Sequence, residues 1–333
     1  MPHPSPAYRV IRAVWRKVKL ARLAGTLARD GLYDLIRYWR WSHGTDGDRT
    51  RMQATHALYK AYHGVEKGLS MAEPRPGFGR DKIAALQFRL DDYARRFEGD
   101  GMPPAVSALH SYRRFNAAHG ISSVPLDVLL DASPDDGSGG TRTVTRDEIA
   151  AATSAVTPDF FWSRHSIRNF SSDPVEMDLI FQAIDMARKT PTVCNRQGPR
   201  VHVFERARDA LDWQPGNRGF GHLASRALVV TTDLQAFSGR GERNQAFIDG
   251  GMFAMSLLYA LHALKLGACP LAWSMPAPAD RKMRHALSVP DSEVVIMMIA
   301  VGHLPSQFEV AQSHRMPIDR FVQIHAETPG NRD

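Results

Sequence analysis

The sequence has only two cysteines in 333 residues, Cys194 and Cys269. Two cysteines cannot form a disulfide framework, and their surroundings are typical of a reduced, intracellular protein. The 14 histidines show no ligand spacing with cysteine or carboxylate residues, so we expect no metal site. No apolar run approaches the roughly 20 residues of a membrane span, and the three prolines in residues 1–6 do not fit a secretory signal. These absences favour a cytoplasmic globular protein.

The positive charge of the chain is confined to one end. The whole sequence has 42 basic and 35 acidic residues, a formal charge of +7. Residues 1–41 contain nine basic and two acidic residues, which is also +7, so the other 292 residues sum to zero. The charge therefore marks a basic N-terminal arm on a neutral body, not a protein that is basic throughout.

Hydrophobic periodicity, glycine and proline divide the chain into four parts: a basic amphipathic arm (1–41), a helical N-terminal domain (42–132), a linker rich in glycine and acidic residues (133–146) and an α+β domain (147–333). Gly31 is expected to split the arm into helices 8–29 and 32–41. The glycine- and proline-rich residues 63–79 are expected to form an irregular loop. Further helices are expected at 49–62, 81–97, 103–119, 147–155, 178–188, 248–266 and 279–287, and strands at 200–204, 227–231 and 294–301.

Two short motifs of the α+β domain could carry chemistry. The first, Arg164-His165-Ser166-Ile167-Arg168, offers charged and neutral donors that suit a phosphate. Taken alone, it could equally be a solvated basic turn. The second, Pro191-Thr192-Val193-Cys194-Asn195-Arg196-Gln197, has amide side chains that could bind the edge of a planar heterocycle. Taken alone, it could be a helix-to-strand connection whose polar side chains bind its own backbone.

The order and interval of these motifs resemble the nitroreductase family of FMN-dependent oxidoreductases. The resemblance covers about residues 160–325. It implies an α+β fold, with a central antiparallel-type sheet flanked by helices, preceded here by a mostly helical domain. It also implies a homodimer with FMN at the interface, in which the loop 191–197 touches the flavin of the other subunit. The family's cofactor contacts fall on Arg164, His165, Ser166, Arg168, Pro191, Thr192, Val193, Asn195, Gln197, Asn217, Pro270, Leu271, Ala272, Trp273 and Arg315.

Several positions depart from the family pattern. Val193 stands where a serine is common and cannot donate a side-chain hydrogen bond, and Gly198 replaces a common proline. Ser313 replaces a second basic residue, so phosphate binding depends more on Arg164, Arg168 and Arg315. Ala272 replaces an acidic or amide residue. These departures concern the substrate more than the cofactor.

The resemblance implies ping-pong hydride transfer from NAD(P)H through flavin N5 to a small organic acceptor, with no catalytic side chain assigned. His165, His222 and His303 are candidate proton donors, although a lone histidine is more often structural. Cys194 has no evident histidine partner, which favours a small loop residue over a nucleophile. The alternative hypotheses are a non-catalytic, scaffold-like protein at a membrane-bound assembly and an enzyme that acts on its own flavin or on a peptide-bound ring.

The N-terminal half contains a segment, His63-Gly64-Val65-Glu66-Lys67-Gly68-Leu69, that resembles long nitroreductase-like proteins linked with polysaccharide formation. Glu66, Lys67 and Arg75 could form a substrate site over the flavin, or an ion pair that holds a turn. The arm, residues 1–41, could lie on the anionic inner face of a membrane, pack on the body, or bind nucleic acid. No nucleic-acid-binding motif is present, so we expect no nucleic-acid partner.

Overall fold

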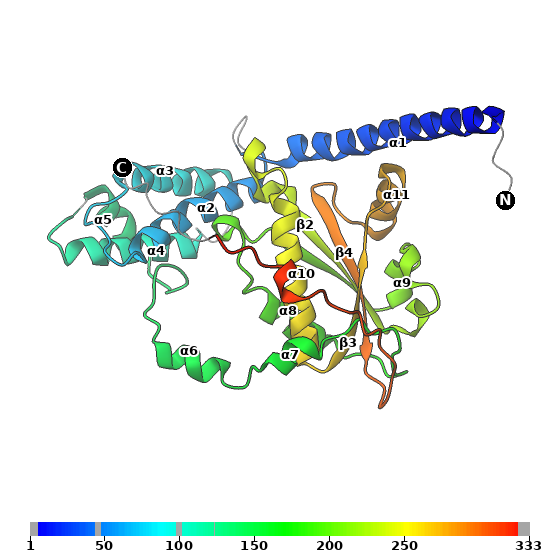
Figure 1. Ribbon diagram of the computed structural model, residues 1–333. Coiled ribbons are helices and arrows are strands. Elements are labelled where there is room, and N and C mark those ends of the chain that lie inside the picture. The colour runs from blue at the N-terminus through cyan, green and yellow to red at the C-terminus, as the bar shows by residue number, and fades with distance from the viewer. Residues whose placement is uncertain (1–5, 44–47, 98–101, 123, 326–333) are drawn as a thin grey trace.

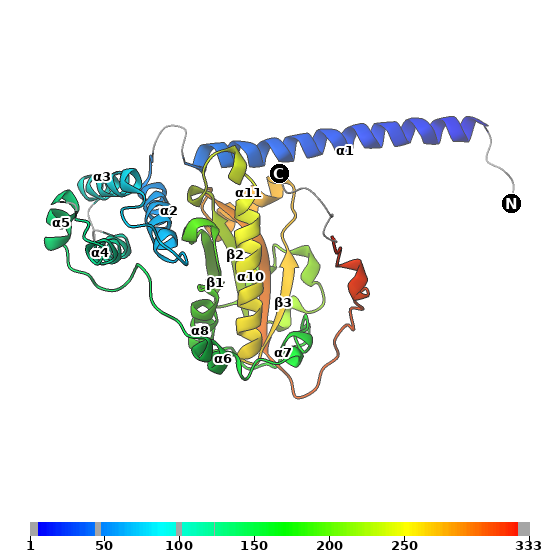
Figure 2. The same ribbon diagram turned by 60° about the vertical axis from the view of Figure 1, so that its left-hand side comes forward.

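The computed structural model describes residues 6–43, 48–97, 102–122 and 124–325 (Figure 1). A bundle of helices lies to one side of an α+β domain, and a long helix runs over that domain and extends away from the bundle (Figure 2). The bundle contains α2 (Arg51–Leu69), α3 (Arg80–Arg96), α4 (Pro103–Ala117) and α5 (Val124–Asp131). Its own apolar core is built on Leu58, Leu86, Leu90, Leu109 and Leu126.

The α+β domain is built on a four-stranded antiparallel sheet with the order β1-β2-β4-β3. The strands are β1 (Pro199–Phe204), β2 (Arg226–Asp233), β3 (Leu266–Ala272) and β4 (Glu293–His303). β4 lies between β2 and β3 and is buried along most of its length, as its unbroken apolar sequence predicts. The predicted α+β class, with a helical N-terminal region, is confirmed.

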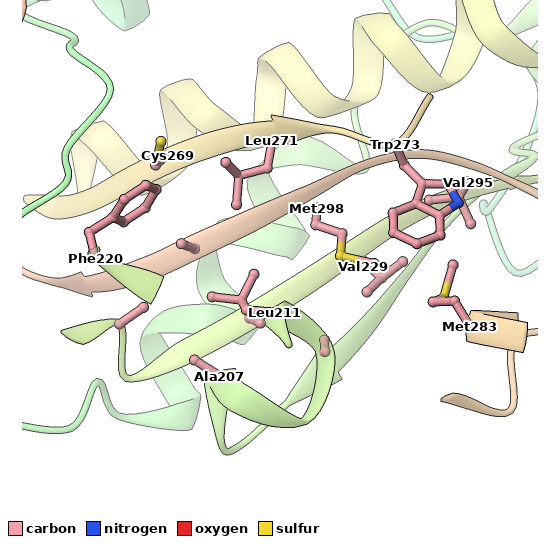
Figure 3. Close-up of a cluster of buried hydrophobic side chains, with 14 of the residues drawn as sticks. Ala207, Leu211, Phe220, Val229, Cys269, Leu271, Trp273, Met283, Val295 and Met298 are labelled. Carbon is pink, nitrogen blue, oxygen red and sulfur yellow. The ribbon is translucent and has the colours of Figure 1, made fainter. Parts of the chain in front are cut away.

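Helices cover both faces of the sheet. α8 (Met177–Ala187) and α10 (Gln245–Ala263) pack on one face around Leu228, Leu257 and Ile299. α9 (Ala207–Leu211) and α11 (Ala277–Leu287) pack on the other face, where the core includes Leu211, Leu271, Trp273, Met283 and Met298 (Figure 3). α6 (Arg146–Thr153) and α7 (Pro158–Trp162) lie on the segment that joins the bundle to this domain.

By length and composition alone, Arg240–Ala263 is long and apolar enough to cross a membrane, contrary to the expectation that no run comes close. Half of the apolar 18-residue stretch in this segment is buried within the protein, and Asp249 on the helix is completely buried. The helix packs on α8 and on the sheet. A helix that is apolar all round and packed in this way is typical of a protein core.

Three local predictions were wrong. The arm is one continuous helix, α1 (Pro6–Trp41), because a single glycine such as Gly31 costs a helix only about 1 kcal/mol. α2 continues through residues 63–69, expected to be a loop; its start is fixed by a capping box between Thr50 and Gln53. Gly68 lets Phe78 lie directly on this last turn, since a Cβ there would be 2.1 Å from the Phe78 ring. The segment Leu266–Ala272, where no strand was expected, is the strand β3.

Candidate flavin phosphate site

The segment 164–168 lies along the open edge of β3. The Ile167 N–H donates to the Ala268 carbonyl at 3.0 Å, and the Ser171 N–H donates to the His303 carbonyl at 3.0 Å. Ile167 and Phe170 are buried in the core, whereas the side chains at 164, 165, 166 and 168 remain accessible. The buried side chains thus fix the segment while its basic residues point outward.

Two glycines make this anchorage possible. A Cβ on Gly302 would lie 2.6 Å from the ring of Phe170, and one on Gly267 would lie 3.1 Å from Ile167. Both glycines are on the paired strands β3 and β4. The close approach of Phe170 to this strand pair therefore requires the absence of side chains at both positions.

The basic residues of this segment line a cavity of about 600 Å³. The C-terminal segment contributes Arg315, so the structure brings together the three arginines that the sequence analysis assigned to a phosphate. Among the described residues, Arg164, Arg168 and Arg315 form no ion pair with a carboxylate, and no residue that lines the cavity is acidic. The lining consists of Phe161, Trp162, Arg164, His165, Ser166, Arg168, Met255, Tyr259, Ala311, Gln312, Ser313, His314 and Arg315.

Three unpaired guanidinium groups around one cavity are costly without an anion, because like charges repel and their donors lack charged acceptors. In the described part of the chain, Arg168 has only weak local partners, the Ser166 carbonyl at 3.5 Å and the ring of Phe220 at 6.0 Å. The residues present therefore fit a phosphate group. The lining also includes Trp162, Tyr259 and His314, which no local sequence pattern predicts because they reach the cavity from α7, α10 and the C-terminal segment.

The second motif, residues 191–197, is not part of this cavity. It lies at the N-terminal end of α10, where the Val193 N–H donates to Asp249 Oδ2 at 3.0 Å. Three residues other than glycine adopt positive φ in this loop: Cys194 (49°), Asn195 (50°) and Gln197 (54°). Such left-handed conformations cost energy outside glycine and are typical of functional loops that their surroundings hold in place.

An ion pair with a fully buried arginine holds the loop. Arg196 is completely buried and donates from Nη1 and Nη2 to both carboxylate oxygens of Glu242, at 2.9 and 2.6 Å. The Thr192 hydroxyl accepts the Gln197 N–H at 2.9 Å. Arg196, which was not singled out from the sequence, thus proves to be the anchor of the loop, while Asn195 and Gln197 remain on its surface.

α2 of the N-terminal bundle holds the same loop from its other side. His56 is 1% exposed, and its Nδ1 lies 2.7 Å from the Arg196 carbonyl. Since a carbonyl only accepts, Nδ1 carries the proton, and Nε2 has no hydrogen-bond partner among the described residues. Tyr62 is hydrogen-bonded to Asn195, and burial raises the pKa of this phenol. The N-terminal bundle therefore supports the loop that is predicted to touch the flavin.

Burial of His56 gives a testable pH dependence. Burial lowers the pKa of His56 to about 3, and the positive charge of Arg200 lowers this pKa further. Because the folded pKa lies below the unfolded value of about 6.5, stability is complete above pH 6.5 and falls as the pH decreases. From pH 7.5 to 5.0 we expect a loss of about 2 kcal/mol in the free energy of unfolding. Urea denaturation at both pH values measures this loss. In His56→Gln the loss should be smaller than in the wild type by at least 1 kcal/mol.

The proposed pH range ends at pH 5.0 because a neighbouring carboxylate titrates below it. Asp233 Oδ2 lies 4.0 Å from His56 Nε2, and burial raises the pKa of Asp233. Protonation of Asp233 therefore acts in the opposite direction at lower pH, stabilising the folded state as the pH falls. An identical pH dependence in the wild type and His56→Gln would show that this histidine is protonated without cost.

The remaining predicted flavin contacts lie elsewhere in the α+β domain. The Asn217 amide donates to the Leu211 carbonyl at 2.6 Å and to the Gln214 carbonyl, so it closes a local turn. Leu271 and Trp273 point into the core (Figure 3), and Trp273 Nε1 donates to Asp280 Oδ1 at 2.8 Å. Pro270 and Ala272 lie on the more accessible side of β3, where the Ala272 carbonyl accepts Gln214 Nε2.

The proposed substrate residues are not brought together by side-chain contacts. Lys67 and Arg75 are exposed, and Glu66 accepts the Gly140 N–H at 3.0 Å. The only ion-pair partner of Glu66 among the described residues is His63, at 3.4 Å. The alternative of an ion pair among Glu66, Lys67 and Arg75 is therefore wrong, and their link to a substrate stays a prediction.

The candidate proton donors and cysteines differ in their surroundings. His165 lines the arginine cavity, His222 is exposed, and His303 Nε2 lies 3.2 Å from Glu176 Oε2. Both cysteines are free; burial raises the pKa of the Cys269 thiol, so that residue is a core side chain. No group of three or more potential metal ligands occurs in the described part of the chain.

The α+β domain resembles known proteins. Residues 162–303 match the model of the Nitroreductase family, so this part of the chain is similar to a family of oxidoreductases. A relative named NADH dehydrogenase, from Thermus thermophilus, is 25% identical over 192 residues, which are 48% of this chain and 91% of the relative.

Solved structures resemble the same half of the chain. A nitroreductase in complex with FMN from Desulfovibrio desulfuricans is 21% identical and covers 52% of this chain and 99% of its own, with a TM-score of 0.44. An FMN-dependent nitroreductase from Clostridium difficile R20291 is 20% identical and covers 46% of this chain and 90% of its own, with a TM-score of 0.39. The helices α1 to α4 lie before the matched domain.

Proposed function

We propose that this protein is an FMN-dependent oxidoreductase that takes hydride from NAD(P)H and passes it to a small organic acceptor. The observation that carries the proposal is the cavity with three arginines that have no carboxylate partners among the described residues, in a domain similar to the Nitroreductase family. A phosphate monoester such as that of FMN supplies the missing negative charge. The name of the Thermus relative, NADH dehydrogenase, supports a nicotinamide as the reductant.

The residues of this chain would bind and orient the cofactor. Arg164, Arg168 and Arg315 would hold its phosphate, and the Ser166 hydroxyl would add a neutral donor. When bound, FMN supplies the hydride-accepting ring atom, so the protein itself needs no covalent catalyst. His165 lies in the phosphate cavity, which favours a role in anion binding over proton transfer to the ring.

A homodimer would complete the site. α10 exposes Phe247, Ile248 and Met252 on the face that does not pack on the sheet. In one protomer, the loop 191–197 is at Asp249 near the start of α10, whereas Met255 and Tyr259 line the arginine cavity about 9 and 15 Å further along the helix. Antiparallel pairing of two α10 helices about a two-fold axis would place the loop of one protomer beside the cavity of the other.

Purification and titration with FMN test the proposal. We expect a yellow protein that binds FMN in a 1:1 ratio per chain, sediments as a dimer, and oxidises NADH or NADPH in the presence of a quinone or nitroaromatic acceptor. Colourless protein that takes up no added FMN would refute the enzyme hypothesis and favour the non-catalytic alternative. Protein that binds FMN but oxidises neither nicotinamide would refute the proposed reductant while retaining the cofactor.

A further inference from the structure

α1 carries a long apolar stripe that no part of the described chain covers. Its residues follow one another at alternating steps of four and three, the spacing that keeps side chains on one side of a helix. All eight are exposed, including residues as large as Trp39, which is 70% exposed. The stripe consists of Val14, Val18, Ala21, Gly25, Ala28, Leu32, Leu35 and Trp39.

The opposite side of the helix makes the contacts with the body. Tyr33 donates to Asp280 Oδ2 at 2.8 Å, and Asp30 accepts the Ala277 N–H at 3.2 Å. Arg37 is buried and donates to the Asp291 carbonyl. These contacts fix the orientation of α1, so the stripe faces away from the α+β domain. The N-terminal end of the helix extends beyond that domain in both views (Figures 1 and 2).

The charges beside the stripe decide what kind of partner it fits. Lys17, Arg22 and Arg29 flank it, and all three are exposed. In a helix pair the residues at these flanking positions face those of the partner helix. A second copy of α1, parallel or antiparallel, would therefore bring like charges together. An anionic surface would satisfy both the apolar stripe and its basic margins.

We propose that α1 lies in the interface of a membrane that contains anionic phospholipids. The stripe would enter the headgroup region, while Lys17, Arg22 and Arg29 reach the lipid phosphates. Trp15, which is 66% exposed beside Val14 and Val18, suits the depth at which indole rings prefer to lie. The helix is about 54 Å long. Lying parallel to the membrane surface, it would hold the domain against the membrane without crossing it.

Vesicle co-sedimentation of the full chain tests this inference. We expect binding to phosphatidylcholine vesicles containing about 30% phosphatidylglycerol, little binding to pure phosphatidylcholine, and loss of binding in about 1 M salt. Each basic residue near an anionic surface contributes roughly a fivefold factor to affinity. The triple variant K17Q/R22Q/R29Q should therefore bind about 100-fold more weakly. The matched control K189Q/R208Q/K282Q changes the same charge at exposed positions of the body and should bind like the wild type.

A second variant and two readouts separate the membrane from other partners. V14Q/W15Q/V18Q retains every charge, so it should lose binding if the stripe inserts. Brominated lipids should quench tryptophan fluorescence in the wild type, and W15F should reduce that quenching. Equal binding to neutral and anionic vesicles would overturn the proposal. Unchanged binding of both K17Q/R22Q/R29Q and V14Q/W15Q/V18Q would overturn it as well. A halved molar mass of V14Q/W15Q/V18Q in lipid-free light scattering would overturn it too, in favour of pairing between two copies.

Discussion

Replacing Arg164 and Arg168 together with glutamine is expected to weaken FMN binding at least about 100-fold and to leave riboflavin binding nearly unchanged. Hydrogen bonds to charged groups contribute about 1.5–3 kcal/mol each, so loss of two such residues costs about 3–6 kcal/mol. Riboflavin has the same ring and ribityl chain but no phosphate, so it does not use these guanidinium groups. Titration followed by quenching of flavin fluorescence measures both affinities.

The design separates a binding defect from a folding defect. Neither arginine forms an ion pair among the described residues, so the cofactor-free variant should unfold at the wild-type temperature. Arg208 is exposed on the same domain, and Arg208→Gln serves as the matched control. If FMN and riboflavin lose affinity equally, the arginines support the ring or the fold. If neither loses affinity, the phosphate lies in another place.

The arginine cluster could be predicted because its chemistry is local. Arg164, Ser166 and Arg168 stand two residues apart along an extended segment, so burial of Ile167 leaves them on the accessible side. The sheet and most helices were equally readable, since β4 has an unbroken apolar run and α3 a clear helical period. These features depend on neighbours in the sequence, which is the information that a single sequence contains.

Features that depend on distant contacts were not readable in the same way. β3 forms because it pairs with β4, and strand preference is decided largely by such partners. α2 continues through Gly64 and Gly68 because the end of the helix packs on Phe78, a residue from a later turn. Tyr259 and His314 reach the cavity from elements that are 90 or more residues from Arg164. The local sequence contains no pattern that predicts these long-range contacts.

The ion pair of Arg196 and Glu242 is the clearest case in which distant contacts determine the site. Arg196 belongs to the loop before β1, and Glu242 lies on the short helix 240–242 before α10. Glu242 also accepts the Ser238 N–H and lies 4.0 Å from Lys60 of α2. One carboxylate thus joins the loop, the α+β domain and the N-terminal bundle.

We expect Glu242→Ala to lower the free energy of unfolding by about 3 kcal/mol, because it leaves the Arg196 cation buried without a partner. The fully buried position of Arg196 means that water cannot easily replace the lost carboxylate. Urea denaturation of the cofactor-free protein at about pH 7.5, where the carboxylate is ionised, provides the measurement. The matched surface control is Glu309→Ala, which removes a carboxylate that forms no ion pair in the described part of the chain.

The double variant Arg196→Met, Glu242→Ala distinguishes an unpaired charge from the loss of a useful contact. Methionine fills most of the space of the arginine stem without a charge, so the double variant should be more stable than Glu242→Ala alone. If the double variant is instead less stable by the sum of both single changes, the two residues act independently and the pair does not hold the loop. Hydrogen exchange at residues 193–197 gives the local view. Exchange should be fastest in Glu242→Ala, because the positive φ values at Cys194, Asn195 and Gln197 persist only while Arg196 is anchored.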